Sequence, residues 1–254
     1  MKAANINLLK EQLPDYLPGV SLDCVILGYQ NQNLSLLTMQ WDQGNYFSLP
    51  GGFIRRDEDL SMAAYRVLEE RTGLKVPMLT QFETFGEINR NDRSFTNHIL
   101  KRFNITDPKI KDWFEQRFIS VGFIALVDKE QCTPGSDMFG NTSSWIPIDQ
   151  LPPLILDHQE MVTSARSFLK KQLNYFPVGS ALLDEKFTMK DLQILYETIL
   201  EKPLDRANFQ KRMLKLDILI RHEKKMDGGA YRAPYLYSFN PIRYRELLDR
   251  GIGY

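Results

Sequence analysis

The sequence predicts an α/β (α+β) chain built in two parts, residues 1–175 and residues 176–254. Three observations support this. The first part alternates β-rich apolar runs with amphipathic stretches of helical spacing. A boundary containing proline and glycine follows at residues 176–179. Beyond it come two helical stretches with good N-cap residues, and then two β-rich runs separated by a glycine-containing segment.

The composition limits the kinds of protein that this chain can be. Its 254 residues suffice for one large domain or two small ones. The formal net charge is zero, so an argument for nucleic acid must rest on how charge is distributed. Cys24 and Cys132 lack the spacing of a zinc site. No apolar run reaches the length of a signal peptide or a membrane span, so we expect a cytoplasmic protein without a membrane partner.

The elements of the first part follow from the spacing of apolar residues. Residues 30–33 have turn chemistry, and Asp57 or Asp59 could cap the first helix, with Gly73 as its stop. The predicted strands are 20–27, 34–39, 78–87, 115–127 and 145–147, and the predicted helices are 59–71 and 157–175. The segments 49–53, 89–112 and 130–143 are expected to be loops, the second with at most one short helix.

The second part is predicted to hold two helices and a β-hairpin. Thr188 is a natural N-cap for a helix at 190–200, and Asp205 for a helix reaching about residue 216. The runs 218–220 and 235–239 flank a basic segment with glycines, which indicates a hairpin.

Residues 52–74 hold glycines, carboxylates and an arginine in a distinctive order. The matching positions are Gly52, Glu58, Arg66, Leu68, Glu70, Gly73 and Leu74. Their spacing resembles the Nudix signature, and the resemblance covers roughly residues 18–175. It implies a Nudix αβα sandwich with a mixed sheet.

Two positions depart from the family pattern. Val67 stands where the family has a glutamate after the arginine, and Arg71 stands where it has the second glutamate of a pair. Hydrolysis of a diphosphate needs carboxylates on one helix face to hold Mg²⁺ or Mn²⁺, which prefer oxygen ligands. Arg71 instead puts a cation where a dication should sit. We therefore expect a non-catalytic domain with no catalytic residue, metal or cofactor.

A Nudix domain without catalysis still keeps a concave site. The predicted effector-binding residues are Arg55, Arg56, Glu70 and Arg71, each of which could equally be a solvated surface residue. Glu58 and Arg66 are expected to form a structural ion pair.

The second part carries the argument for DNA. Residues 176–254 contain 14 Lys and Arg against 11 Asp and Glu, and residues 205–232 contain eight against four. Arginine pairs with guanine, asparagine and glutamine pair with adenine, and lysine suits phosphates. A basic helix is nevertheless often only a solvated face. The predicted DNA-binding residues are Arg206, Asn208, Gln210, Lys211, Arg212 and Lys215 on the helix, and Lys224, Lys225 and Arg232 on the hairpin.

The runs 187–197, 204–212 and 235–239 resemble the winged-helix domain of Nudix-related transcriptional regulators, as does Asp157-His158. This resemblance implies a ligand-responsive regulator that binds a near-palindromic double-stranded operator as a homodimer. The family includes ADP-ribose sensors and sugar-utilisation regulators of the arabinose type from Bacteroidetes. The sequence is more similar to the latter, so the expected effector is a sugar such as arabinose, or an ADP-ribose-like nucleotide.

Two alternatives stay open. A surviving hydrolase could act on ADP-ribose or a related nucleoside diphosphate with Mg²⁺, if Glu83, Glu87 or Glu115 supplied the missing ligands. The winged helix could instead bind a protein partner. His158 is expected to form a hydrogen bond at a helix start rather than to catalyse.

Overall fold

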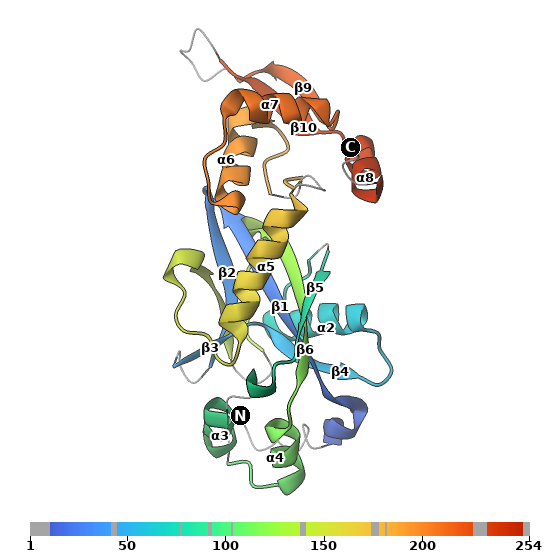
Figure 1. Ribbon diagram of the computed structural model, residues 1–254, viewed down its shortest axis with the longest axis vertical. Helices are drawn as coiled ribbons and strands as arrows, with labels where there is room; N and C mark the ends of the chain where they lie inside the picture. Colours follow the sequence, from blue (N-terminus) through green and yellow to red (C-terminus); the bar gives the residue numbers. More distant parts are fainter. Residues whose placement is uncertain are drawn as a thin grey trace. The chain divides into compact units, whose positions relative to one another are not determined.

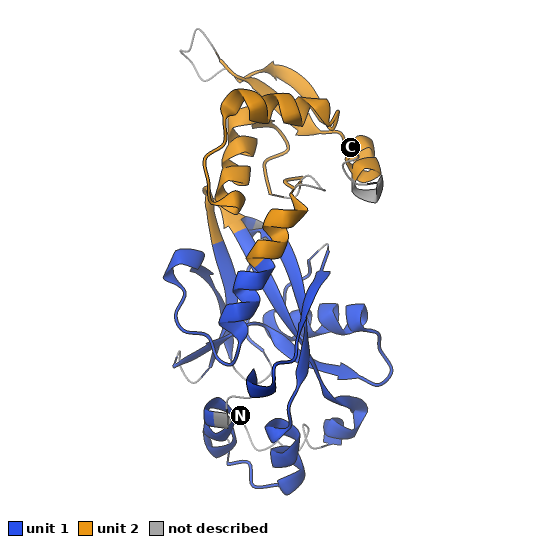
Figure 2. Ribbon diagram, in the orientation of Figure 1, with its two compact units in different colours: residues 1–28, 35–165 blue, residues 29–34, 166–254 orange. Residues whose placement is uncertain are grey.

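The computed structural model describes residues 11–41, 45–76, 78–90, 93–102, 104–137, 141–173, 178–180, 182–225 and 233–250. The chain divides into two compact units (Figure 2). Unit 1 comprises residues 1–28 and 35–165, and unit 2 comprises residues 29–34 and 166–254. One long helix therefore contributes residues to both units.

A seven-stranded sheet forms the centre of unit 1 (Figure 1). The strand order is β3-β2-β1-β6-β5, with β4 paired to β1 and β7 paired to β2. The strands are β1 (Tyr16–Gln30), β2 (Asn33–Trp41), β3 (Tyr46–Ser48), β4 (Gly51–Arg55), β5 (Thr80–Phe85), β6 (Ile119–Asp128) and β7 (Thr142–Pro147).

Helices cover both faces of this sheet. Residues 22–29 of β1 are all buried, as expected for a strand covered on both sides. Alternate residues point to opposite faces. Leu22, Cys24 and Ile26 pack against α2 (Leu60–Thr72), whereas the intervening Asp23 lies 3.6 Å from His158 in α5 (His158–Gln172). The predicted α/β class and αβα sandwich are confirmed.

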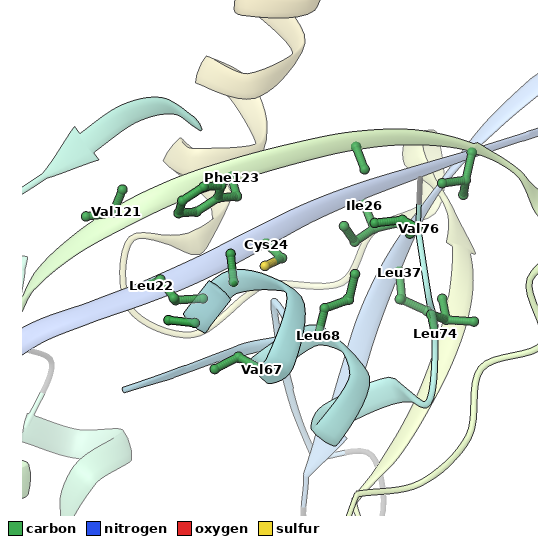
Figure 3. Close-up of a cluster of buried hydrophobic side chains, with 14 of the residues drawn as sticks. Leu22, Cys24, Ile26, Leu37, Val67, Leu68, Leu74, Val76, Val121 and Phe123 are labelled. Atoms are coloured by element: carbon green, nitrogen blue, oxygen red, sulfur yellow. The ribbon is translucent and has the colours of Figure 1, made fainter. Parts of the chain in front are cut away.

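The core between the sheet and α2 is apolar (Figure 3). Val67 is 2% exposed and belongs to this core. The position that holds a glutamate in the Nudix pattern is therefore a buried packing position here. The cluster draws Leu22, Cys24 and Ile26 from β1, Ala63, Ala64, Val67 and Leu68 from α2, and Val121, Phe123, Ala125 and Val127 from β6.

The predicted ends of the first turn and helix are confirmed. Asn31 and Gln32 have φ values of 49° and 65°, which suit a two-residue hairpin turn. The Asp59 carboxylate accepts a hydrogen bond from the Met62 amide at 2.8 Å and caps α2. Gly73 ends the helix with φ 72°.

The segment 89–112 corrects the loop prediction, because it is largely helical. It contains the end of η3 (Ile88–Arg90), α3 (Arg93–Arg102) and most of α4 (Pro108–Glu115). These helices share a small core made of Leu13, Leu100, Ile105 and Ile110, with Trp113 and Phe114 packed against it. Both helices are short, ten and eight residues, and their shared core takes Leu13 from outside the segment, so residues 89–112 alone do not show what stabilises them.

One further loop prediction and one strand prediction need correction. Residues 51–55 form β4, which pairs with β1 at Ser21–Phe53, although Leu49–Phe53 was expected to be a loop. Residues 115–118 precede β6, which begins at Ile119. A glycine pair resembles a turn in sequence, but here it lies within a short strand.

Unit 2 contains the predicted helices and hairpin. Thr188 and Asp191 form a reciprocal capping box at the start of α6, and Asp205 caps α7. The hairpin segment 226–232, including Arg232, lies outside the described residues. The elements are β8 (Phe187–Thr188), α6 (Met189–Leu200), α7 (Arg206–Lys215), β9 (Leu219–Lys224), β10 (Tyr235–Phe239) and α8 (Pro241–Arg250), and the strands form a sheet in the order β8-β10-β9.

Within the described ranges, no helix combines the length and the apolar character needed to cross a bilayer.

Candidate functional site

Glu58 is held in a structural ion pair between β4 and α2. Its carboxylate accepts hydrogen bonds from the Arg55 amide at 2.7 Å and from Arg66 Nε at 2.8 Å, and its side chain is 8% exposed. Burial raises the pKa of Glu58, but hydrogen bonds from Arg66 and Arg55 and their positive charges outweigh it and lower this pKa overall. Glu58 is therefore ionised, and the predicted Glu58–Arg66 pair is confirmed.

Glu70 is also engaged by arginines. Its carboxylate bonds to Arg66 Nη1 at 2.9 Å and to Arg55 Nη2 at 3.2 Å. Arg66 further donates to the Phe53 carbonyl at 2.9 Å, which ties α2 to β4. Glu58 and Glu70, the two glutamates that match the Nudix pattern, thus both form ion pairs with arginines.

Arg71 lies one helical turn beyond Val67 and bonds to two other segments. Its Nε donates to the Gly51 carbonyl at 2.9 Å, and its Nη1 donates to Asp137 Oδ2 at 3.0 Å. The Asp137 side chain is 0% exposed, so this buried carboxylate depends on its hydrogen-bond donors.

Asp137 bonds to Asn141 as well as to Arg71. Its carboxylate also accepts from the Asn141 amide at 2.8 Å and from Asn141 Nδ2 at 3.0 Å. The Gly135 amide donates to the Thr72 carbonyl at 2.8 Å. Arg71 and Thr72, at the C-terminal end of α2, therefore bond to Asp137 and Gly135.

The residues around α2 do not fit a divalent metal. Glu58 and Glu70 are committed to arginines, Val67 offers no oxygen, and Arg71 places a positive charge beside Gly51. In the described part of the chain, no three His, Cys, Asp or Glu side chains are grouped so that they could hold a metal. The exposed Glu83, Glu87 and Glu115, which the hydrolase alternative needs, join no such group.

A cleft of about 450 Å³ lies at the start of β1, next to the end of β4. The Arg56 amide donates to the Asp15 carbonyl at 2.8 Å, and Arg56 Nε donates to the Pro14 carbonyl at 2.9 Å, which fixes one wall. The cleft is lined by Gln12, Asp15, Tyr16, Arg55, Arg56 and Asp57.

The structure brings together only part of the predicted effector set. Arg55 and Arg56 line the cleft, Glu70 is connected to it through its ion pair with Arg55, and Arg71 bonds elsewhere. Sequence reasoning missed Tyr16, which lies opposite Arg55 in the β1–β4 register. Recognition of β4 as a strand was the signal that could have found it.

Tyr16 of the cleft lining packs against Phe53, which belongs to an aromatic cluster that includes Trp113 of the helical insertion. The Phe53 ring lies 5.8 Å from Tyr16, 5.6 Å from Trp113 and 5.2 Å from Phe118, measured between centroids. The indole nitrogen of Trp113 is buried, and no acceptor among the described residues bonds to it. The insertion therefore helps to build the apolar surroundings of Tyr16.

His158 belongs to a buried polar network at the start of α5. Its Nδ1 accepts a hydrogen bond from the Leu49 amide at 2.9 Å, as predicted for a residue at a helix start. Burial lowers the pKa of His158 despite the nearby Asp23 and Asp157 carboxylates. The adjacent Arg90 bonds to Asp157 at 2.6 Å. A neutral His158 acts here as a structural hydrogen-bonding residue.

In unit 2, α7 presents a polar face of the predicted kind. Phe209 and Met213 are buried, whereas the predicted contact residues lie off that stripe. Arg206, Asn208, Lys211, Arg212 and Lys215 are exposed, and Gln210 is half-buried.

The hairpin places further cations on the surface. Lys224 and Lys225 are exposed near the end of β9. Lys224 Nζ lies 5.5 Å from the centroid of the Tyr235 ring, and Arg221 Cζ lies 4.8 Å from it. Arg221 was not among the predicted contacts, although its charge was visible in the sequence.

Comparison with known proteins gives two domain matches. Residues 17–171 match the NUDIX domain, and residues 179–239 match the NrtR DNA-binding winged helix domain. The ADPR responsive transcriptional repressor NtrR of Acinetobacter baylyi (strain ATCC 33305 / BD413 / ADP1) is 27% identical over 255 residues, which cover 97% of this chain and 92% of that protein.

Two solved structures share the architecture. Shewanella oneidensis NrtR complexed with a 27mer DNA superposes with a TM-score of 0.65 and 26% identity, covering 89% of this chain and 95% of that one. A MutT/nudix family protein from Enterococcus faecalis gives a TM-score of 0.63 at 19% identity, covering 94% of each chain, and supports the fold alone. These matches do not support the expected similarity to arabinose-type regulators. Because the NUDIX match covers more than half of the sequence, this chain belongs to the Nudix family.

Proposed function

We propose that this protein is a transcriptional repressor that binds double-stranded DNA and responds to ADP-ribose bound by its Nudix domain. The observation that carries the proposal is the exposed polar and basic face of α7 within a domain that matches the NrtR DNA-binding winged helix. A recognition helix needs long donors near its N-terminus, where they reach base edges in the major groove.

The residues of α7 and the hairpin divide by chemistry. Arg206, Asn208 and Gln210 lie in the first part of α7 and are assigned to base edges. The lysines and arginines farther along α7 and on the hairpin are assigned to phosphates, which position the protein without specifying sequence. The Shewanella relative was crystallised with a 27mer DNA, which supports DNA as the partner. Binding as a homodimer to a near-palindromic operator is part of the proposal.

The cleft beside β4 suits a diphosphate better than an uncharged sugar. Its lining contains the carboxylates of Asp15 and Asp57 beside the adjacent Arg55 and Arg56, and the two guanidinium groups are the ones that bind phosphate oxygens strongly. The Acinetobacter relative is described as responsive to ADPR, which favours ADP-ribose over arabinose as the effector. Glu70 is assigned to the positioning of Arg55, with which it forms an ion pair.

The domain is proposed to sense its ligand rather than to hydrolyse it, because the residues around α2 do not fit a divalent metal. A repressor acts where the chromosome lies, which agrees with the expectation of a cytoplasmic protein.

Fluorescence anisotropy tests this proposal. Labelled DNA from upstream of the gene and of its neighbours is titrated with the full chain across a salt series, with and without ADP-ribose, arabinose or xylose. The expected result is sequence-selective binding that ADP-ribose alone weakens. Only weak, sequence-independent binding would contradict the DNA assignment and favour a protein partner. A response to arabinose alone would overturn the effector assignment.

A further inference from the structure

We propose that Arg71 is a built-in cation that takes the place of a divalent metal, so that this Nudix domain binds its effector without Mg²⁺ or Mn²⁺. The choice of ADP-ribose as the probe rests on the proposed function, whereas the claim about metal stands on the geometry around α2. The affinity for the effector should therefore not depend on a divalent metal, and this can be measured.

The positive charge of Arg71 opposes the binding of a metal ion. The guanidinium of Arg71 bonds to the Gly51 carbonyl and to the buried Asp137 carboxylate. Carbonyl and carboxylate oxygens are the ligands that hard dications prefer. A metal ion that approached these oxygens would meet a fixed positive charge only a few ångströms away, and like charges at such a distance repel strongly.

Close packing at Val67 leaves no room for a hydrated metal ion. Val67 is 2% exposed, and its two methyl carbons would lie 3.0 Å from a Cβ built on Gly52. No solvent-filled space remains at this contact for a hydrated ion. The helix face that would present ligands is instead apolar at Val67 and cationic at Arg71.

Arg71 also joins two segments that a metal ion could otherwise have joined. Arg71 bridges Gly51 at the start of β4 and Asp137, and Asp137 in turn bonds to Asn141. A bridging cation is therefore already part of the chain. The guanidinium of Arg71 thus already occupies the oxygens of Gly51 and Asp137 that a bridging metal ion would need.

Calorimetry on the unaltered full chain gives the first test. ADP-ribose is titrated in EDTA, in Mg²⁺ and in Mn²⁺. The expected dissociation constants agree within about threefold. A larger loss of affinity in EDTA would overturn the inference. If ADP-ribose fails to bind in every buffer, the effector assignment fails, and the metal claim is decided by the second test.

The second test measures Mn²⁺ directly by electron paramagnetic resonance. We expect no saturable Mn²⁺ site in the unaltered full chain. The double variant Val67→Glu/Arg71→Glu should gain such a site, and adding Glu70→Gln to the double variant should remove it. Thermal unfolding checks that the variants fold. A saturable Mn²⁺ site in the unaltered protein that Glu70→Gln abolishes would overturn the inference. This comparison needs only the unaltered protein and Glu70→Gln, so it remains possible if the double variant does not fold.

Discussion

At the scale of single residues, Arg206, Asn208 and Lys224 are alike in exposure but differ in proposed task. Because a base contact discriminates among sequences, we expect Arg206→Ala or Asn208→Ala to weaken operator binding by about 1–3 kcal/mol and to change binding to random DNA little. Lys224→Ala should weaken both and reduce the salt slope by about 1. Anisotropy titrations on both DNAs measure these effects.

Lys75→Ala provides a matched control for the loss of one surface cation. Lys75 lies in unit 1, and its side chain is 79% exposed. It should leave the affinity for both DNAs nearly unchanged. If the three variants in unit 2 behaved alike, the assignment of α7 as the recognition helix would be wrong.

Glu58 gives a signed dependence of stability on pH. Its pKa is lowered in the folded state, so it contributes stability above the pKa of an unfolded glutamate, about 4.3, and this contribution is lost as pH falls through the folded pKa. Glu58→Gln should lower the free energy of unfolding at pH 7 by about 1–3 kcal/mol, since Arg66 loses the more buried of its two carboxylate partners, Glu58 and Glu70. Urea unfolding from pH 7 to about pH 3 should show the difference from the unaltered chain narrowing below about pH 5.

Glu69→Gln is the comparison for Glu58. Glu69 forms a surface pair with Lys75 and its side chain is 53% exposed, so a change within about 0.5 kcal/mol is expected. A difference between Glu58→Gln and the unaltered chain that stays constant down to pH 3 would show that the carboxylate charge is not the cause.

At the scale of elements, the insertion formed by α3 and α4 buries a donor without an acceptor. Trp113 packs against Phe53, but its indole N–H has no partner in the described residues. Trp113→Phe should stay within about 1 kcal/mol of the unaltered chain, because the loss of packing is offset by removal of an unsatisfied donor. Trp113→Ala should lower the free energy of unfolding by about 3 kcal/mol. Chemical denaturation measures both, and equal losses would show that the ring contributes nothing beyond its N–H.

Local signals decided which elements could be predicted. The caps Asp59, Thr188 and Asp205 marked helix starts correctly, because a capping side chain and its amide partner are close in sequence. The insertion at 89–112 was missed because its helices are stabilised by contact with Leu13, far away in the chain. Strand β4 was missed because its glycines suggest a turn, whereas pairing with β1 makes it extended.

The candidate site shows the same limit. Arg55 and Arg56 could be proposed from the motif that contains them, but Tyr16 enters the cleft only through strand pairing. The charge of Arg71 was visible, whereas its bond to Asp137 joins residues 66 positions apart. Spacing within the motif therefore found the Glu58–Arg66 pair, but it could not find partners that lie far away in the chain, such as Asp137 for Arg71.

At the scale of the whole molecule, the proposed function requires reciprocal coupling. If saturating ADP-ribose lowers the affinity for the operator by some factor, operator DNA must lower the affinity for ADP-ribose by the same factor. A coupling of about 5- to 150-fold is typical of allosteric proteins. Anisotropy with and without ADP-ribose, and calorimetry with and without DNA, give the two factors independently.

Arg55→Ala separates sensing from DNA binding in this comparison. Arg55 lines the cleft in unit 1, so its removal should abolish the response to ADP-ribose and preserve operator affinity in its absence. Retention of the full response would place the effector elsewhere.

The glycine pair at 51–52 is required by packing rather than by reactivity. A Cβ on Gly51 would lie 2.0 Å from Asp23 Oδ1, and Asp23 is held by Ser120 at 2.6 Å. This restriction applies whether or not such a domain cleaves anything. In this chain the first glycine is needed for packing, although Val67 and Arg71 stand where the Nudix pattern has glutamates. When Nudix domains without hydrolase activity are sought in genomes, the positions of Val67 and Arg71 are the informative ones. An intact glycine pair does not indicate that a domain hydrolyses its ligand.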